Sequence, residues 1–348
     1  MAQRRLTYIQ AVNEALRQEM RRDPSIILMG EDIAGGAGRE EQGIVDAWGG
    51  PFGVTKGLIQ EFGAERVRDT PISEMGFIGA AVGAAMTGLR PVVELIFSDF
   101  LGVALDQIMN QAAKMRYLLA GEVKVPLVIR TTFGASLTGS QYLGGGTGPQ
   151  HSQALYAPLV HIPGLKCIAP SNAYHAKGLY AAAIRDDNPV VIFDHKLLYP
   201  QHVPVPEEAY TLPIGRAEVR REGRDVTLVG ISRMVDVCLE AASALAQEGI
   251  QAEVIDLLSL SPLDEEAVLG SLARTKRLVI VDESYPRCSV AGDIAALAAD
   301  KGFDFLDAPV KTVTSPHAHI PYSSALEELY LPNAARVVAV VKEVMGKE

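Results

Sequence analysis

The segment from Arg66 to Phe100, RVRDTPISEMGFIGAAVGAAMTGLRPVVELIFSDF, carries the pattern from which we infer the fold. Arg66–Thr70 is typical of a short strand, and Pro71 prevents this strand from continuing directly into a helix. The next residues predict a Gly/Ala-rich helix over Met75–Leu89, and Pro91–Phe97 is an almost continuous apolar run. Because strands buried on both faces of a parallel sheet have such runs, the segment predicts a strand–helix–strand unit of an α/β fold.

The same alternation extends along the chain on both sides. Beyond Tyr199–Leu212, a proline-containing stretch without periodicity, it resumes with a helix around Val235–Gln247. We therefore expect two α/β domains, 1–198 and 215–348, joined by a linker over 199–214. Further strands are predicted at Ile26–Gly30, Val125–Thr132, Leu165–Pro170, Pro189–His195 and in the runs DVTLVGIS, AEVIDLL, RLVIVDES and DFLDAPV, and a further helix at Leu101–Leu118.

Composition and charge narrow the class of protein. The 348 residues carry a formal net charge of −10, which argues against nucleic acid as the main partner because phosphate binding needs a basic face. Three cysteines without CxxC spacing suggest free thiols in a reducing compartment. No apolar stretch approaches the ~20 residues of a membrane span, and no signal segment follows MAQRR, so we expect a cytoplasmic protein.

Four short motifs each lack a residue or a spacing that their usual chemistry requires. They would otherwise indicate a dinucleotide fingerprint, a P-loop, a nucleophile elbow and a metal site. The four are Gly36–Glu41, with Glu41 in place of a third glycine; Gly144–Gly148, without a following Lys-Ser or Lys-Thr; Gly134–Gly139, one residue too long; and His317 with His319, without another ligand at metal spacing.

The segment Gly53–Gly121 resembles, nearly residue for residue, the pyrimidine-binding domain of the beta subunits of thiamine-diphosphate-dependent 2-oxo acid dehydrogenases of the pyruvate, branched-chain and acetoin types. The resemblance continues through MGEDIA, HSQ at His151, PGLKCIAP, FDHKLLY and YLPNAARVVAVVKE. It implies two doubly wound domains, a parallel-sheet pyrimidine-binding domain and a smaller transketolase C-terminal-like domain. It also implies an oxidoreductase whose active site is completed by an alpha subunit.

Glu74 is the first candidate for a catalytic residue, because it lies in the first turn of the Gly/Ala-rich helix, where we expect it to be buried. The resemblance implies that its carboxyl group shares a proton with N1′ of the aminopyrimidine and so promotes removal of the C2 proton of the cofactor. The local pattern alone fits an acid that stabilises the helix dipole. The resemblance further implies that Phe100 packs on the aminopyrimidine; otherwise it is an ordinary core residue.

His151 is the second catalytic candidate. It follows the Gly-rich loop Gly134–Gln150 and is predicted to open a helix at HSQ. The resemblance implies that it lies at the mouth of the active site and assists transfer to the lipoyl group, whereas a loop or capping histidine is the alternative. The loop is several residues longer than is usual in the family, which leaves the position of His151 and the substrate entrance open.

One further glutamate, one further histidine and a potassium site complete the candidates. Glu94, inside an apolar strand, should have a structural partner because an unpaired buried carboxylate is costly, and His195 is predicted to be structural. The resemblance implies a potassium ion held by main-chain carbonyl groups, while a capped helix-ending turn is the alternative. The positions are Leu127, Ala183, Asp186 and Asn188.

The sequence also predicts what a partner must supply. Thiamine enzymes bind the diphosphate through a metal held by GDG and a later Asn, and no GDG occurs here. The resemblance therefore implies an alpha subunit that holds Mg²⁺ in an α2β2 heterotetramer, together with a lipoyl-bearing acyltransferase core. The helix Gly76–Gly88 and the stretch Met109–Tyr117 are the expected interface. A transketolase-like partner fragment that transfers ketol units, and a non-catalytic scaffold subunit, are the alternatives.

Overall fold

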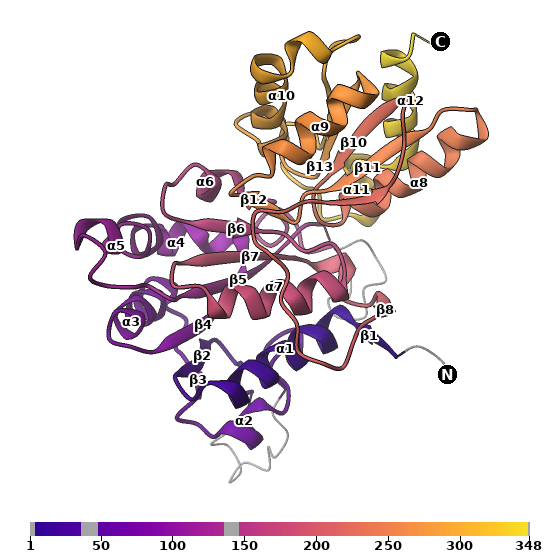
Figure 1. Ribbon diagram of the computed structural model, residues 1–348. Helices are drawn as coiled ribbons and strands as arrows, with labels where there is room; N and C mark the ends of the chain where they lie inside the picture. The colour runs from indigo at the N-terminus through magenta and orange to yellow at the C-terminus, as the bar shows by residue number, and fades with distance from the viewer. Residues whose placement is uncertain (1–3, 36–47, 136–145, 347–348) are drawn as a thin grey trace. The chain divides into compact units, whose positions relative to one another are not determined.

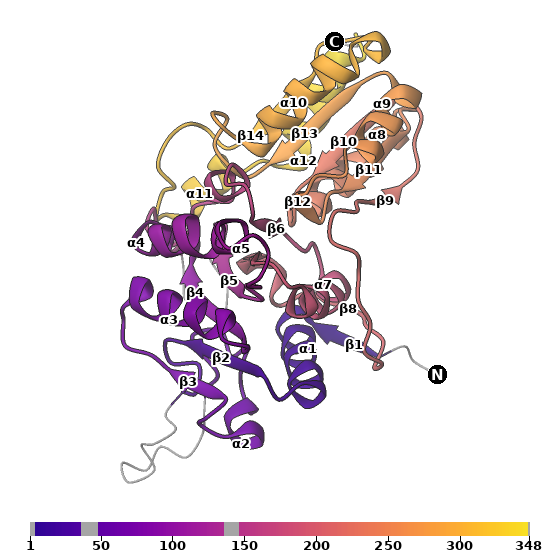
Figure 2. The same cartoon turned by 60° about the vertical axis from the view of Figure 1, so that its left-hand side comes forward.

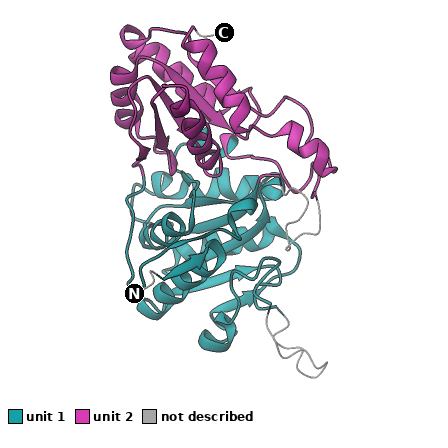
Figure 3. Cartoon of the chain, turned by 90° about the vertical axis from the view of Figure 1, so that its right-hand side faces the viewer, with its two compact units in different colours: residues 1–133, 158–214 teal, residues 134–157, 215–348 magenta. Residues whose placement is uncertain are grey.

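The computed structural model describes residues 4–35, 48–135 and 146–346, and the chain divides into two compact units. One comprises residues 1–133 and 158–214, and the other residues 134–157 and 215–348 (Figure 3). The segment 134–157 thus belongs to the C-terminal unit, although it lies between two stretches of the N-terminal unit in the sequence. The two domains expected from the sequence, which are divided only at the linker 199–214, place this segment in the N-terminal domain instead.

The N-terminal unit contains a parallel sheet built from the predicted apolar runs (Figure 1). Its strands follow the order β6-β7-β5-β4-β2-β3, and each neighbouring pair is parallel. The central strands β5 and β7 are buried along their whole length, as expected where helices cover both faces. The strands are β2 (Ile26–Gly30), β3 (Val67–Asp69), β4 (Arg90–Phe97), β5 (Val128–Phe133), β6 (Lys166–Ile168) and β7 (Val190–His195).

Helix α1 (Tyr8–Arg22) begins at a capping box formed by Thr7 and Gln10. The Thr7 hydroxyl accepts a hydrogen bond from the Gln10 amide (3.1 Å), and the Gln10 side chain accepts one from the Thr7 amide (2.9 Å), which is a capping box. The buried face of α1 packs against α7 (Ala173–Arg185). The other helices here are α2 (Leu58–Phe62), α3 (Glu74–Met86), α4 (Leu101–Asp106), α5 (Met115–Leu118) and α6 (Ala157–Val160), with 3-10 turns η2 (Ser98–Phe100) and η4 (Lys196–Leu198).

The single helix predicted over Leu101–Leu118 is interrupted in the structure. Between α4 and α5 lies a π-helical stretch, η3 (Gln107–Ala112), after which the Ala113 amide bonds the Ile108 carbonyl five residues back (3.0 Å). The backbone of Gly164 lies against this turn, and a Cβ atom at that position would come within 2.2 Å of the Ala113 carbonyl oxygen. The wider turn therefore occurs where another chain segment packs closely on the helix.

The linker is ordered because the N-terminal unit binds its backbone. β8 (His202–Pro204) pairs antiparallel with β1 (Arg5–Thr7). Further along, the buried Lys177 amine lies among linker carbonyl groups. It donates hydrogen bonds to the carbonyl oxygens of Pro206 (2.6 Å), Glu207 (3.0 Å) and Glu208 (3.0 Å) and to the carboxylate of Glu14 (2.6 Å).

The C-terminal unit has a sheet of its own, in the order β14-β13-β10-β11-β9, with helices on both faces (Figure 2). All pairs are parallel except β11 with β9, an antiparallel edge strand that the sequence analysis did not predict. The strands are β9 (Glu218–Arg221), β10 (Val226–Gly230), β11 (Ala252–Asp256), β13 (Leu278–Asp282) and β14 (Lys311–Thr314), and a short strand β12 (Ser259–Ser261) follows β11.

The last predicted strand of this unit is wrong in position. DFLDAPV does not form a strand; Phe303–Phe305 is the 3-10 turn η5, and β14 begins at Lys311. Two aspartates and a proline make that run unsuitable for a buried strand, whereas Lys311–Thr314 has β-branched residues and its last two are buried. The helices are α8 (Met234–Gln247), α9 (Glu265–Thr275), α10 (Val290–Lys301), α11 (Ser324–Tyr330) and α12 (Ala334–Val344).

The core of the C-terminal unit lies between its sheet and two of these helices. Buried valine, leucine and alanine side chains of α8 and α12 pack on residues of β10, β11 and β13. Among the described residues, no helix has the length and apolar character needed to cross a membrane.

Candidate active site

The carboxyl ends of three neighbouring strands bring the first candidates together. β2 pairs with both β3 and β4 in parallel, so the residues that follow these strands emerge at the same edge of the sheet. Glu31 directly follows β2, Thr70 follows β3, and Phe100 ends the turn after β4. This edge is where open α/β sheets bind their ligands.

Glu74 is the first residue of α3 and is only 9% exposed, as predicted. Ser73 precedes the helix in a non-helical conformation, and its side chain makes no capping hydrogen bond. The helix buries Phe77, Ile78 and Ala81, while Gly76 and Gly83 lie on its exposed side. The carboxyl group is thus held at a helix start, partly removed from water.

Glu31 is an acid that the sequence analysis did not single out. It is 9% exposed, and burial raises its pKa, as do the nearby charges of Glu74, Asp32 and Glu94. The Glu74 charge therefore acts electrostatically on Glu31. The signal that could have identified it is the acid directly after a buried strand in MGEDIA.

The side chains at this edge fit the aminopyrimidine end of thiamine diphosphate. The Thr70 hydroxyl is buried and has no hydrogen-bond partner among the described residues, so the site has a polar atom available for a ligand. Phe100 is half-buried and meets Phe97 edge-on, with ring centroids 5.6 Å apart. A buried carboxyl group, an unpaired hydroxyl and an aromatic ring are suited to a flat, protonatable heterocycle.

Glu94 has the structural partner that the sequence predicts. Its carboxylate accepts a hydrogen bond from the buried guanidinium of Arg130, which also donates to Asp194 (3.2 Å), Tyr180 (3.0 Å) and Tyr199 (3.2 Å). Burial raises the pKa of Glu94 despite the nearby positive charge, and the Glu94 charge holds the pKa of Arg130 above its ordinary value although burial opposes this. The pair therefore has a structural role in the core of the N-terminal unit.

His195 is structural, as predicted. It is 1% exposed, its Nδ1 accepts a hydrogen bond from the Leu197 amide (3.1 Å), and its ring meets Phe133 edge-on. Residues 36–47 and 136–145 lie outside the described residues. They include all of Gly36–Glu41, most of Gly134–Gly139 and part of Gly144–Gly148. The described residues contain no group of three or more His, Cys, Asp and Glu side chains that could hold a metal, His317 and His319 included.

His151 lies in the C-terminal unit and is not at the start of a helix, so that prediction is wrong. Residues 152–156 have no regular secondary structure, and α6 begins only at Ala157, with Pro158 in its first turn. Side-chain contacts hold this segment instead: Ser152 and Thr147 share a hydroxyl hydrogen bond (2.5 Å), and the residues after His151 bond the end of β13. His151 itself is half-buried.

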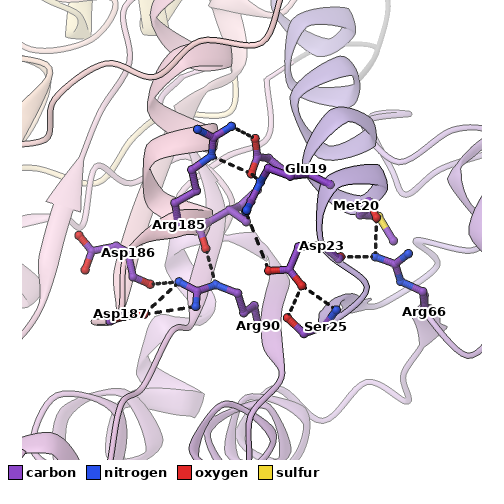
Figure 4. A network of polar contacts seen from close by, with 11 residues as sticks. Glu19, Met20, Asp23, Ser25, Arg66, Arg90, Arg185, Asp186 and Asp187 are labelled. Atoms are coloured by element: carbon purple, nitrogen blue, oxygen red, sulfur yellow. Dashed lines mark hydrogen bonds and ion pairs between the residues drawn. The ribbon is translucent and has the colours of Figure 1, made fainter.

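The four positions of the expected potassium site converge on one turn. The Leu127 carbonyl accepts from the Val190 amide (2.9 Å), and the Ala183 carbonyl accepts from the Asp186 amide (3.2 Å). Asn188 donates to the Asp186 carboxylate (2.8 Å). Arg90 donates to the Asp186 carbonyl (2.8 Å) and to Asp187, as Figure 4 shows. The turn is therefore also stabilised by a cationic side chain, and an ion would have to use the remaining carbonyl lone pairs.

Comparisons with known proteins give the class to which this fold and site belong. A family model described as the pyrimidine-binding domain of transketolase matches residues 4–201, and one described as the transketolase C-terminal domain matches residues 215–337. A solved structure named as a split-gene transketolase, an inactive beta4 tetramer, has a TM-score of 0.73, with 98% of each chain covered. At 23% identity, that likeness shows the shared fold alone. The chain thus has the two-domain architecture of the transketolase-like class.

Curated relatives give the particular branch. The beta subunits of acetoin:2,6-dichlorophenolindophenol oxidoreductase from Bacillus subtilis (strain 168) and Cupriavidus necator are 52% and 50% identical, with 96–98% of each chain covered. A mitochondrial pyruvate dehydrogenase E1 beta subunit from Arabidopsis thaliana is 42% identical over 97% of this chain and 88% of its own. The protein belongs to the family of beta subunits of thiamine-diphosphate-dependent 2-oxo acid dehydrogenases, and is an oxidoreductase subunit.

Proposed function

We propose that this chain is the beta subunit of the acetoin-cleaving component of a dehydrogenase complex, in which a thiamine diphosphate shared with an alpha subunit passes an acyl group to a lipoyl group. The buried Glu74 carboxyl group at the start of α3 is the observation that carries the cofactor role. Identity supports acetoin as substrate, since the two acetoin-type relatives are 50–52% identical and the pyruvate-type relatives 40–43%.

The residues of this chain would act on the aminopyrimidine. Thiamine diphosphate supplies a carbon nucleophile at C2 when it is bound. Glu74 would hold a proton at N1′ of the ring. Phe100 would fix the plane of the ring. His151 would hold or donate a proton during transfer to the lipoyl sulfur.

The partner would complete the site. The sequence has no GDG motif, so we propose that an alpha subunit holds Mg²⁺ and the diphosphate in an α2β2 heterotetramer, and that a lipoyl-bearing acyltransferase receives the product. Large exposed apolar side chains, which often mark interfaces, lie on and beside the two expected interface segments. They are Met75, Val103, Tyr117 and Leu118. The buried, free thiols of Cys167 and Cys238 suit a reducing compartment such as the cytoplasm.

Reconstitution tests this assignment. The purified chain alone should bind thiamine diphosphate weakly and show no cleavage activity, because the diphosphate-binding residues are absent. Adding an alpha subunit with the GDG motif should restore both, which is measured by calorimetry and by reduction of 2,6-dichlorophenolindophenol with acetoin or a panel of 2-oxo acids. Robust turnover by the homogeneous chain alone would contradict the shared site, and a strong preference for pyruvate would replace acetoin as the substrate.

His151→Ala should separate two stages of the reaction. We expect ~10²-fold slower acylation of a lipoyl domain, the lower end of the range for general acid–base catalysis, with little change in exchange of the cofactor's C2 proton. A histidine with only a loop role would instead reduce stability by about 1 kcal/mol and affect both steps equally. Rapid-quench acylation and C2-proton exchange by NMR on the same variant distinguish the two cases.

Potassium binding is tested without activity. If the carbonyl groups of Leu127, Ala183, Asp186 and Asn188 hold the ion, potassium should raise the unfolding temperature of the assembled protein, and lithium at equal ionic strength should not, because the smaller ion does not fit a site of main-chain carbonyls. An equal response to both ions would indicate that the turn is only a capped helix end.

A further inference from the structure

Of four consecutive residues at the carboxyl end of β13, three bond the segment that carries His151, and the fourth bonds Ala135 ahead of it. We call Asp282–Tyr285 the β13 anchor and residues 146–157 the His151 segment. The Tyr156 hydroxyl donates to the Asp282 carboxylate, the Ser284 hydroxyl donates to the Ala154 carbonyl (3.1 Å), and the Tyr285 hydroxyl donates to the Gln153 side chain (3.1 Å). Glu283 accepts from the amide of Ala135, ahead of the segment in the chain (2.8 Å).

The β13 anchor is rigidly placed. β13 pairs in parallel with β10 on one side and β14 on the other. Asp282 is fully buried and also accepts hydrogen bonds from the Ser284 amide (2.8 Å) and from the Ala291 amide in the first turn of α10. Burial raises the pKa of Asp282 to about 6, so the carboxylate is largely ionised at neutral pH and accepts a strong bond from Tyr156.

The other end of the His151 segment is also fixed. A Cβ atom on Gly146 would come within 2.1 Å of the Tyr322 carbonyl oxygen, so the backbone lies directly against that residue. The Thr147 hydroxyl bonds Ser152, and the His151 amide lies 3.4 Å from the Gly148 carbonyl. His151 therefore lies between two attachments, and no helix or strand of its own determines its position.

We propose that Tyr156 and Asp282 are positioning residues that hold His151 in place for acyl transfer. The inference rests on the proposed function, because it gives the C-terminal unit a part in the step assigned to His151. A segment without its own hydrogen-bond ladder takes its position from side-chain contacts, and the buried bond from the Tyr156 phenol to the Asp282 carboxylate is charge-assisted and therefore strong. A displacement of 1 Å at a catalytic group can reduce a rate 10²-fold.

The test uses the assembled enzyme with acetoin, its alpha subunit and a purified lipoyl domain. Tyr156→Phe removes one hydroxyl and leaves the ring in place. We expect acylation of the lipoyl domain to fall by ~10- to 100-fold, while C2-proton exchange stays unchanged. Deuterium exchange of the peptide 146–157 should become about fivefold faster, because the loss of one net hydrogen bond makes opening of the segment more frequent by about that factor. Tyr285→Phe should give a smaller change of the same kind.

Tyr210→Phe is the matched control. It also removes one tyrosine hydroxyl, which lies in the linker and donates a hydrogen bond to the Tyr174 carbonyl of α7 (2.7 Å). It should leave deuterium exchange of 146–157 and acylation unchanged. Two results would overturn the positioning role. One is that deuterium exchange of the peptide 146–157 is unchanged in Tyr156→Phe. The other is that Tyr156→Phe exchanges deuterium faster but acylates the lipoyl domain at the normal rate, while His151→Ala acylates it slowly. Normal acylation in His151→Ala would instead remove the role of His151, and the positioning claim with it.

Discussion

Glu74→Gln should slow exchange of the C2 proton of bound thiamine diphosphate by ~10²–10⁴-fold, the range of general acid–base catalysis. Glutamine has the shape of the buried carboxyl group but cannot hold a transferable proton at N1′. The substitution also removes a charge from beside Glu31, whose pKa that charge helps to raise, so the site should not be destabilised. The exchange rate is measured by NMR after acid quench of the assembled enzyme.

Glu65→Gln provides the control, because the Glu65 carboxylate is 95% exposed and forms only a surface pair with Arg68. Its C2-proton exchange should equal that of the unchanged enzyme. If Glu74→Gln assembled normally and exchanged the proton at the ordinary rate, the carboxyl group would have no part in proton transfer. Its effect would then be limited to helix α3, where an acid in the first turn contributes ~0.3–1 kcal/mol.

Arg130→Met should lower the free energy of unfolding by about 3–5 kcal/mol, the usual result of breaking a buried ion pair from one side. Arg130 is 1% exposed and serves two carboxylates, Glu94 and Asp194, that are themselves buried. Without the guanidinium, these groups would have to remain charged without a partner or bind protons. Methionine fills part of the space but donates no hydrogen bond. Urea unfolding of the chain at neutral pH measures the loss.

Arg68→Met is the matched control, since Arg68 pairs with Glu65 at the surface and such pairs contribute ~0–1 kcal/mol. A second substitution, Glu94→Gln, made together with Arg130→Met, should recover part of the lost stability because it removes one unpaired charge. A loss of 1 kcal/mol or less in Arg130→Met, with no recovery in the double variant, would mean that the buried network contributes little to folding.

Much of the fold could be predicted because its strands are buried on both faces. A strand such as Ile26–Gly30 is recognised from its own residues, and the structure begins and ends β2 at those positions. The linker and the burial of Glu74 likewise depend on neighbours in the sequence. The strand predicted at DFLDAPV does not form, because Asp307 and Pro309 oppose a buried strand in spite of the hydrophobic residues around them.

The site could be predicted only where local sequence determines position. Glu31 was missed because its significance comes from Glu74, more than 40 residues away, across the β2–β3 pairing. The helix expected at His151 does not form, because the residues after it bond the end of β13, over 120 residues further along the chain. Contacts of this kind leave no periodic trace in a single sequence. They become visible only when the strand order is known.

The contact of Lys177 with the linker has a consequence for how this region can vary in evolution. The amine recognises the main-chain oxygens of Pro206, Glu207 and Glu208, and every amino acid has such an oxygen. The side chains there can therefore be exchanged with little effect on the contact. An inserted or deleted residue, however, would move the oxygens out of reach, and the buried ammonium group would keep its bond to Glu14 but lose those to the three carbonyl oxygens. Homologues should accordingly differ in linker composition much more often than in linker length.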